Sequence, residues 1–142
     1  MITLAQIDDI KDIIKLSNEV FVSSFSEADI SFFIKQKQTF FVYVIKEELE
    51  FVGFIILWIN DNNGQIIDLA IKENKRRLNY GRKLVEFSLD FFKQNEVKLV
   101  SLEVRVSNIA AIKLYEAFNF KVERTLSNYY KTEDGLFMMR SL

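Results

Sequence analysis

Three apolar segments follow one another between residues 39 and 72, separated only by short stretches of three residues. They run from Thr39 to Lys46, from Glu50 to Asn60 and from Gly64 to Lys72. The tetrapeptide Asp61-Asn62-Asn63-Gly64 is a strong hairpin signal, because asparagine and glycine accept the backbone angles that tight turns require. Strands joined by such turns lie antiparallel and side by side. We therefore expect a meander of these strands in the middle of the chain.

Helical and strand patterns alternate on both sides of this meander. Ser26 begins a capping box that predicts the start of a helix, and Gly135 follows Asp134 in a second turn signal. The other strands are expected at residues 1–5, 97–106, 121–125 and 136–140, and the helices at 6–21, from 26, at 80–94 and at 108–118. The order β-α-α-β-β-β-α-β-α-β-β predicts a mixed α+β fold.

Histidine and cysteine are both absent from the 142 residues. Their absence excludes disulfides, thiolate nucleophiles, Ser-His-Asp triads and metal sites built on histidine or cysteine. Catalysis then depends on carboxylates, lysine, tyrosine, serine or threonine, and backbone N–H groups. Direct group transfer between two bound substrates is a reaction that this set can support.

The charges are nearly balanced, with 19 basic and 20 acidic residues, so the chain lacks the positive field of a dedicated nucleic-acid binder. The longest apolar run, Phe51–Ile59, is interrupted by Gly53 and is too short to span a bilayer. No targeting segment, linker or repeat marks a domain boundary. We expect one domain over residues 1–142, located in the cytoplasm, with no membrane and no direct nucleic-acid partner.

A strand, a basic turn and the start of a helix follow one another from Ile66 to Leu84. Free backbone N–H groups at a helix N-terminus bind anions such as pyrophosphate, and the cations between Lys72 and Arg77 strengthen that field. A solvated basic turn before an ordinary helix is the structural alternative. Neither a Rossmann nor a P-loop motif occurs in the sequence.

A second group of polar residues lies in the strand 97–106 and the helix that follows it. Strand alternation places Glu103 on the same face as Ser101 and Arg105. Asn108 and Tyr115 are seven residues apart, close to two helical turns, so both can face one cleft. The structural alternative is that Glu103 pairs with Arg105 or a lysine and that Tyr115 packs on the sheet.

These residues resemble motifs of the GNAT superfamily of N-acetyltransferases. Arg76-Arg77-Leu78-Asn79-Tyr80-Gly81 is similar to the family's Arg/Gln-x-x-Gly-x-Gly/Ala coenzyme loop, with Asn79 in place of the first glycine. The stretch Leu102–Phe120 resembles the signature of bacterial ribosomal-protein-alanine N-acetyltransferases, with Asn119 in place of the usual glycine. Asn128-Tyr129-Tyr130 and Glu133–Met138 resemble elements of the N-terminal acetyltransferases.

The resemblance implies the GNAT fold, a mostly antiparallel twisted sheet of about seven strands flanked by about four helices. It also implies acetyl-coenzyme A (acetyl-CoA) as the cofactor, with no metal. The residues that the resemblance assigns to the coenzyme are Leu69, Ala70, Ile71, Arg76, Arg77, Leu78, Asn79, Tyr80, Gly81, Arg82 and Asn108.

The same resemblance gives roles to the remaining site residues. Glu103 is the general base for the substrate amine, acting through water, and Tyr115 donates a proton to the departing thiolate. Backbone N–H groups of Leu69–Ile71 polarise the thioester carbonyl. Tyr129 and Tyr130 bind the acceptor peptide, with packing on the sheet edge as their structural alternative. An α-amino group has an ordinary pKa of about 8 and tyrosine one of about 10, which suits a carboxylate base and a phenolic acid.

The predicted function is acetyl transfer to the N-terminal α-amine of a protein, with a small-subunit ribosomal protein as the family's typical substrate. Because the chain has no cysteine to carry the acetyl group, direct attack within a ternary complex is expected. Acetylation of a small amine or a lysine side chain is one alternative, and a non-catalytic module that binds coenzyme A is another. The sequence leaves open whether the protein is a monomer or a homodimer.

Overall fold

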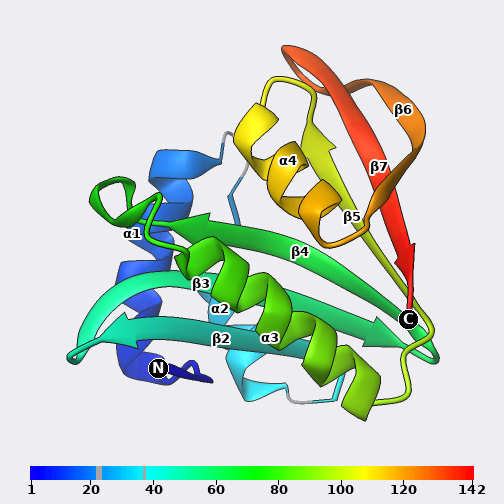
Figure 1. Ribbon diagram of the computed structural model, residues 1–142. Coiled ribbons are helices and arrows are strands. Elements are labelled where there is room, and N and C mark those ends of the chain that lie inside the picture. The colour runs from blue at the N-terminus through cyan, green and yellow to red at the C-terminus, as the bar shows by residue number, and fades with distance from the viewer. Residues whose placement is uncertain (22–23, 37) are drawn as a thin grey trace. The chain divides into compact units, whose positions relative to one another are not determined.

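The computed structural model describes residues 1–21, 24–36 and 38–142 (Figure 1). Within them, the chain forms seven strands, four α-helices and two short 3-10 turns. The strands are β1 (Ile2–Leu4), β2 (Phe40–Glu47), β3 (Glu50–Asn60), β4 (Asn63–Ile71), β5 (Leu99–Arg105), β6 (Lys121–Tyr130) and β7 (Glu133–Ser141). The helices are α1 (Ile10–Val20), α2 (Glu27–Lys35), α3 (Tyr80–Gln94) and α4 (Ile109–Ala117), and the 3-10 turns are η1 (Ile7–Asp9) and η2 (Glu73–Lys75).

The predicted order of elements is confirmed, and the strands belong to one mixed sheet in the order β1-β2-β3-β4-β5-β7-β6. Helix α3 has the bounds that its apolar spacing predicts. The capping box is also present, because the Asp29 N–H donates to Ser26 Oγ at 3.1 Å and the Ser26 N–H donates to Asp29 Oδ2 at 3.0 Å. None of the helices in the described residues combines the length and the apolar character that crossing a bilayer requires.

Met1–Trp58 and Asp68–Leu84 form the first of two compact units. Its strands β1, β2 and β3 are antiparallel neighbours, with Val44 of β2 opposite Phe54 of β3. Helices α1 and α2 lie on one face of these strands (Figure 1). The core of this unit contains buried side chains from both helices and from β2 and β3, among them Ile13, Ile30, Val44, Phe54 and Ile56.

Ile59–Ile67 and Val85–Leu142 form the second unit. Strand β5 pairs antiparallel with β7, and its parallel pairing with β4 runs from Asn63↔Leu99 to Ile66↔Leu102. Strand β6 is the other neighbour of β7. Alternate residues of β5 are buried, which confirms the predicted apolar face and leaves Glu103 half-buried on the opposite face. The assignment of residues 1–142 to a single domain stays a prediction.

Both glycines of the turn signals lie inside strands, although the β3–β4 turn falls within the predicted Asp61–Gly64 signal and only the β6–β7 turn forms away from its glycine. The β3–β4 turn lies at residues 61–62, so Gly64 is inside β4, where a Cβ atom would lie 2.7 Å from the Phe92 ring of α3. Gly135 is likewise inside β7, where a Cβ atom would lie 2.9 Å from the Tyr130 ring. Both glycines therefore make space for a ring that packs on the strand. Strands β6 and β7 also extend beyond the predicted segments 121–125 and 136–140.

Asparagine replaces glycine at two positions without changing the backbone conformation. Asn79 and Asn119 both have φ 68°, in the left-handed region that favours glycine and tolerates asparagine better than other residues. Asn119 ends α4, because the Phe120 N–H donates to the Tyr115 carbonyl at 3.1 Å. The departures from the glycine motif therefore preserve both turns.

Candidate active site

The loop before α3, in the first unit, passes through the left-handed region at Arg77 (φ 63°) and again at Asn79 (φ 68°). Turns of this kind make concave sites in which backbone N–H groups attract anions. The helical hydrogen bonds of α3 begin with the Lys83 N–H, which donates to the Asn79 carbonyl at 3.0 Å. The first N–H groups of an α-helix have no acceptor within the helix itself. This backbone is suited to a pyrophosphate.

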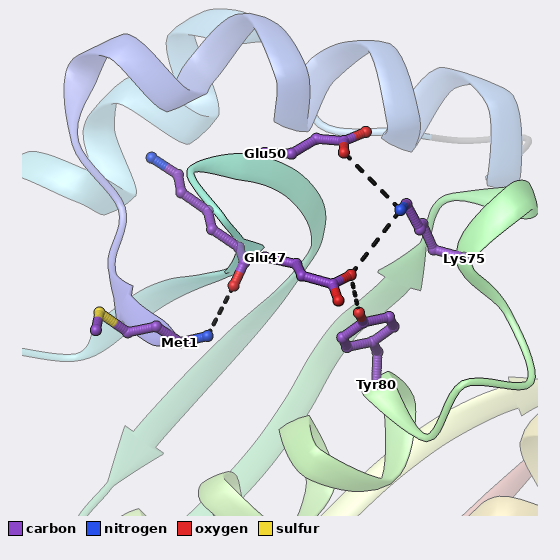
Figure 2. A network of polar contacts seen from close by, with 6 residues as sticks. Met1, Glu47, Glu50, Lys75 and Tyr80 are labelled. Atoms are coloured by element: carbon purple, nitrogen blue, oxygen red, sulfur yellow. Dashed lines mark hydrogen bonds and ion pairs between the residues drawn. The ribbon is translucent and has the colours of Figure 1, made fainter.

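Two side chains of the loop have partners within the protein. Arg76 Nε donates to the Ile71 carbonyl at 3.1 Å, which holds the loop to the end of β4. Tyr80 is buried, and its hydroxyl donates to Glu47 Oε2 in a network that includes Lys75 (Figure 2). Because both side chains are engaged within the protein, Arg76 and Tyr80 can contact a coenzyme only through their backbone. Glu47 was not predicted from the sequence, because it lies 33 positions from Tyr80 and no local pattern connects them.

Strand β4 carries the residues predicted to polarise the thioester. Leu69, Ala70 and Ile71 lie in the part of β4 that follows its parallel pairing with β5, which ends at Ile66. Asp68, immediately before them, is half-buried, and burial raises the pKa of its carboxyl group to about 7. A carboxyl group in that range can gain or lose a proton near neutral pH. Asp68 was missed, although a carboxylate inside an apolar strand is a signal that sequence reasoning can use.

Glu103 is the first residue of β5 beyond its pairing with β4, which ends at Leu102. The hydroxyl of Tyr129 donates to Glu103 Oε1 at 2.8 Å. This hydrogen bond, with a smaller contribution from burial, raises the pKa of Tyr129 to about 12. The alternative pairing of Glu103 with Arg105 is wrong, because the Arg105 guanidinium lies 3.3 Å from Glu133 instead. The structure therefore joins two residues that were predicted to act on the same substrate.

The end of the β6–β7 hairpin is fixed to the turn that follows β5. Glu133 accepts hydrogen bonds from the Ser107 N–H and the Ser107 hydroxyl, both at 2.9 Å, and these bonds lower the pKa of Glu133. Arg105 lies over the ring of Tyr130, 4.2 Å from its centroid. The rings of Tyr129 and Tyr130 meet edge to face, with centroids 5.1 Å apart. These contacts hold the exposed Tyr129 above the end of β5.

Asn108 and Tyr115 differ in their surroundings although they share α4. Asn108 is exposed and caps the helix, since its Oδ1 accepts from the Ala111 N–H at 3.2 Å. Its side-chain amide nitrogen is then the group that can donate to a coenzyme. Tyr115 is buried and packs edge to face on Phe120, with centroids 5.7 Å apart. The structure thus shows Tyr115 packed on Phe120, whereas packing on the sheet was its structural alternative, and its proton transfer stays a prediction.

Each unit thus gathers one half of the predicted chemistry. The first unit carries the loop predicted to bind the coenzyme, and the second carries Glu103, which is hydrogen-bonded to Tyr129, together with Tyr115 and Tyr130. A carboxylate next to phenols can accept and donate protons, but it does not supply a redox group. The part of the chain that the structure describes contains no group of histidine, cysteine or acidic side chains arranged to bind a metal ion.

Comparison with known proteins identifies the relatives of this chain. The model of the Acetyltransferase (GNAT) family matches residues 7–120. An N-alpha-acetyltransferase of Saccharolobus solfataricus is 32% identical over 97% of this chain and 90% of its own length. The ribosomal protein bS18-alanine N-acetyltransferase of Escherichia coli is 29% identical over 79% of this chain and 76% of its own length.

Solved structures share the fold. The crystal structure of the ribosomal-protein-S18-alanine N-acetyltransferase from Escherichia coli superposes with a TM-score of 0.89, covering 99% of this chain and 92% of that one at 23% identity. The fold, the family match over most of the chain and the similarity to an archaeal relative lead to one conclusion. This chain is a member of the GNAT acetyltransferase family.

Proposed function

We propose that this enzyme transfers the acetyl group of acetyl-CoA to the N-terminal α-amine of a protein. The observation that carries the proposal is the hydrogen bond from Tyr129 to Glu103, which joins a half-buried carboxylate to an exposed aromatic side chain at the end of β5. The carboxylate is the base that an amine acceptor requires, and Tyr129 and Tyr130 offer rings and hydroxyls to a peptide backbone. The relatives named above, which act on N-terminal or alanine amines, support this acceptor.

The proton transfers follow from the residues of the second unit. Glu103, directly or through water, removes a proton from the acceptor ammonium group, and the neutral nitrogen attacks the thioester carbon. Acetyl-CoA supplies the activated acetyl group. As the tetrahedral adduct collapses, the carbon–sulfur bond breaks and the nitrogen gives its second proton to water, which leaves the neutral amide. Tyr115 gives its proton to the departing sulfur. Because GNAT acetyltransferases use acetyl-CoA and this chain has no cysteine, the acetyl group passes directly from coenzyme to amine.

The coenzyme is proposed to bind with its pyrophosphate against the loop Arg76–Arg82. The two left-handed residues and the first turn of α3 provide the kind of backbone that binds phosphate groups. Backbone N–H groups of Leu69–Ile71 would polarise the thioester carbonyl. Asn108 would donate from its side-chain amide. We place the acceptor among cytoplasmic proteins, with a ribosomal protein as the first candidate.

The proposal is tested by acetyl transfer to a short peptide that begins with alanine, followed by mass spectrometry. The matched controls are the same peptide with a blocked N-terminus and an internal lysine, and a panel of small primary amines. We expect acetylation at the α-amine and much slower transfer to the controls. Equal or faster transfer to lysine or small amines would replace the proposed acceptor. Coenzyme binding without transfer to any acceptor would identify a non-catalytic module.

Tyr115→Phe tests the proposed acid in the same assay. General acids contribute on the order of 10²- to 10⁴-fold, so single-turnover transfer should slow by about that factor while coenzyme affinity stays close to wild type. Phe120→Leu, which alters the packing of the same ring without removing the hydroxyl, is the control. A rate for Tyr115→Phe within twofold of the control would leave Tyr115 with a packing role alone.

A further inference from the structure

A network of polar contacts joins the β2–β3 turn to both ends of the coenzyme loop (Figure 2). Glu47 ends β2 and Glu50 begins β3, and the two residues are opposite each other in the hairpin. Lys75 Nζ lies 3.9 Å from Glu47 Oε2 and 3.8 Å from Glu50 Oε2. The Tyr80 hydroxyl donates to the same Oε2 atom of Glu47. One carboxylate oxygen therefore contacts both Lys75 and Tyr80.

These two contacts bracket the loop. Lys75 is the last residue of η2 and Tyr80 is the first residue of α3, so the segment between them is residues 76–79. That segment contains Arg77 and Asn79, the two left-handed residues of the loop. Left-handed conformations are costly for residues other than glycine, and they persist where the surrounding structure holds them in place. Glu47 provides such a restraint at both ends of the segment.

The charges indicate that this network positions the loop and does not itself bind an anion. Glu47 and Glu50 have the wrong sign to contact a pyrophosphate, and their carboxylates offset the charge of Lys75, which would otherwise be a phosphate ligand. The distribution of burial agrees. The Glu47 side chain is 51% exposed, whereas Tyr80 is 9% exposed and its ring lies 5.4 Å from Lys83 Nζ. The carboxylate thus fixes a phenol that packing has already placed at the start of α3.

We propose that Glu47 is a positioning residue for the coenzyme: through Tyr80 and Lys75 it holds residues 76–79 in the conformation that binds the pyrophosphate of acetyl-CoA. The inference rests on the proposed coenzyme site and extends it to a turn that does not itself contact the ligand. A loop that is already held in its binding conformation loses less conformational entropy when the ligand binds. Removing the restraint should therefore weaken coenzyme binding more than it slows the chemical step.

The test compares Glu47→Ala, Tyr80→Phe and the double variant by calorimetry with coenzyme A and by steady-state acetylation of the alanine-initiated peptide. Each single variant should raise the coenzyme dissociation constant and the acetyl-CoA KM by about tenfold, with kcat and the peptide KM within about twofold of wild type. The coenzyme dissociation constant of the double variant should be no higher than that of the single variant that binds more weakly, because both changes break the contact between Glu47 and Tyr80. Glu47→Gln, which keeps an acceptor for Tyr80, should recover part of the affinity.

Glu48→Gln is the matched control, because it removes a carboxylate from the same turn and Glu48 is exposed. It should leave the coenzyme dissociation constant unchanged. The melting temperature of every variant shows whether weaker binding comes from loss of the fold or from loss of the loop conformation alone. The inference is overturned if Glu47→Ala binds coenzyme as wild type does, if Glu48→Gln weakens binding equally, or if the Glu47 and Tyr80 effects are fully additive.

A separate variant distinguishes this inference from the coenzyme site on which it rests. Gly81→Val places a branched side chain at the start of α3 and should weaken coenzyme A strongly if the loop is the site. If Gly81→Val weakens binding and Glu47→Ala does not, the site stands and the positioning role is wrong. If neither variant changes binding, the loop is not the coenzyme site and both ideas fail. If Glu47→Ala weakens coenzyme binding but no peptide is acetylated, the positioning role stands and the proposed acceptor is wrong.

Discussion

The two units each contain a hydrogen bond from a tyrosine to a glutamate, and the two bonds are built in opposite ways. In the first unit the tyrosine is buried and the carboxylate is exposed, with Lys75 beside it. In the second unit Tyr129 is 51% exposed and Glu103 is half-buried. Both bonds raise the pKa of the tyrosine, so the electrostatic effect on the phenol does not tell them apart.

The member of the pair that is buried determines what the bond can do. When the phenol is fixed by packing, as for Tyr80, the exposed carboxylate can only reinforce its position. When the carboxylate is fixed in a strand, as for Glu103, the exposed phenol can move away and another donor can take its place. An acceptor amine is such a donor. The first bond therefore belongs to the scaffold, and in the proposed mechanism the second is the one that the substrate exchanges.

The largest effect is expected from Glu103→Gln compared with Glu47→Gln. Both variants remove one carboxylate charge and keep an acceptor oxygen for the tyrosine. Loss of a general base should lower kcat on the order of 10²- to 10⁴-fold for Glu103→Gln, whereas kcat of Glu47→Gln should stay within about twofold. Single-turnover acetylation at saturating acetyl-CoA measures both. Similar kcat values for the two variants would remove the distinction between the pairs.

The pKa of Asp68 is set mainly by burial, so the stability difference between Asp68→Asn and the wild type should depend on pH. Its pKa is raised from 3.8 to about 7, so between these values the unfolded chain gives up the proton while the folded chain keeps it. The contribution of Asp68 to the stability of the wild type therefore falls as the pH rises from about 4 to about 7. Asp68→Asn should be more stable than wild type by on the order of 2 kcal/mol at pH 8, and the difference should shrink towards pH 4.

Urea unfolding at pH 4, 6 and 8 measures the effect, with Asp90→Asn on the exposed face of α3 as the control. The control should show no comparable dependence on pH. A gain in Asp68→Asn that is the same at every pH would indicate a packing effect and not a proton held by burial.

Tyr129→Phe should have a smaller effect that falls on the acceptor. Loss of the hydroxyl should raise the peptide KM by about three- to tenfold and leave the acetyl-CoA KM unchanged, the reverse of the pattern expected for Tyr80→Phe. Reversal of these patterns would contradict the comparison directly. The difference in ultraviolet absorbance between wild type and Tyr129→Phe should show a phenol that ionises at about pH 12. The stability that the bond provides is present below pH 10 and is lost as the pH rises through about 12.

The smallest effect is expected at Asn79, where glycine should be accepted. Asn79→Gly keeps the left-handed conformation and should change coenzyme affinity by less than about twofold, while Asn79→Ala should cost about 1 kcal/mol of stability. Thermal unfolding and calorimetry with coenzyme A measure the two quantities. Equal behaviour of the alanine and glycine variants would show that the backbone conformation at Asn79 does not matter to the site.

Local patterns predicted the elements of the fold well. Apolar spacing gave α3 its bounds, and the capping box located the start of α2, because both signals act within a few residues. The use of the two glycines has a different cause. Gly64 and Gly135 make space for aromatic rings from other elements, and nothing in the neighbouring sequence distinguishes that use of glycine from a turn.

Sequence reasoning proposed residues for the candidate site, but it did not predict the contacts between them. The resemblance named Glu103 and Tyr129 separately, and they are 26 positions apart, so their hydrogen bond depends on the pairing of β5, β7 and β6. Glu47 carried no motif at all. Its role depends on a hairpin that brings an ordinary surface carboxylate to Tyr80, which sequence reasoning alone does not reveal.

The turn between Glu47 and Glu50 contains residues that do not suit its backbone conformation. Glu48 (φ 50°) and Leu49 (φ 72°) are both left-handed, and Leu49 is 94% exposed, in a two-residue hairpin where asparagine and glycine fit best. Selection retains sequences that exceed a stability threshold and does not drive each position to its optimum. This turn is therefore a place where asparagine and glycine can raise heat resistance without altering a residue predicted to contact a substrate.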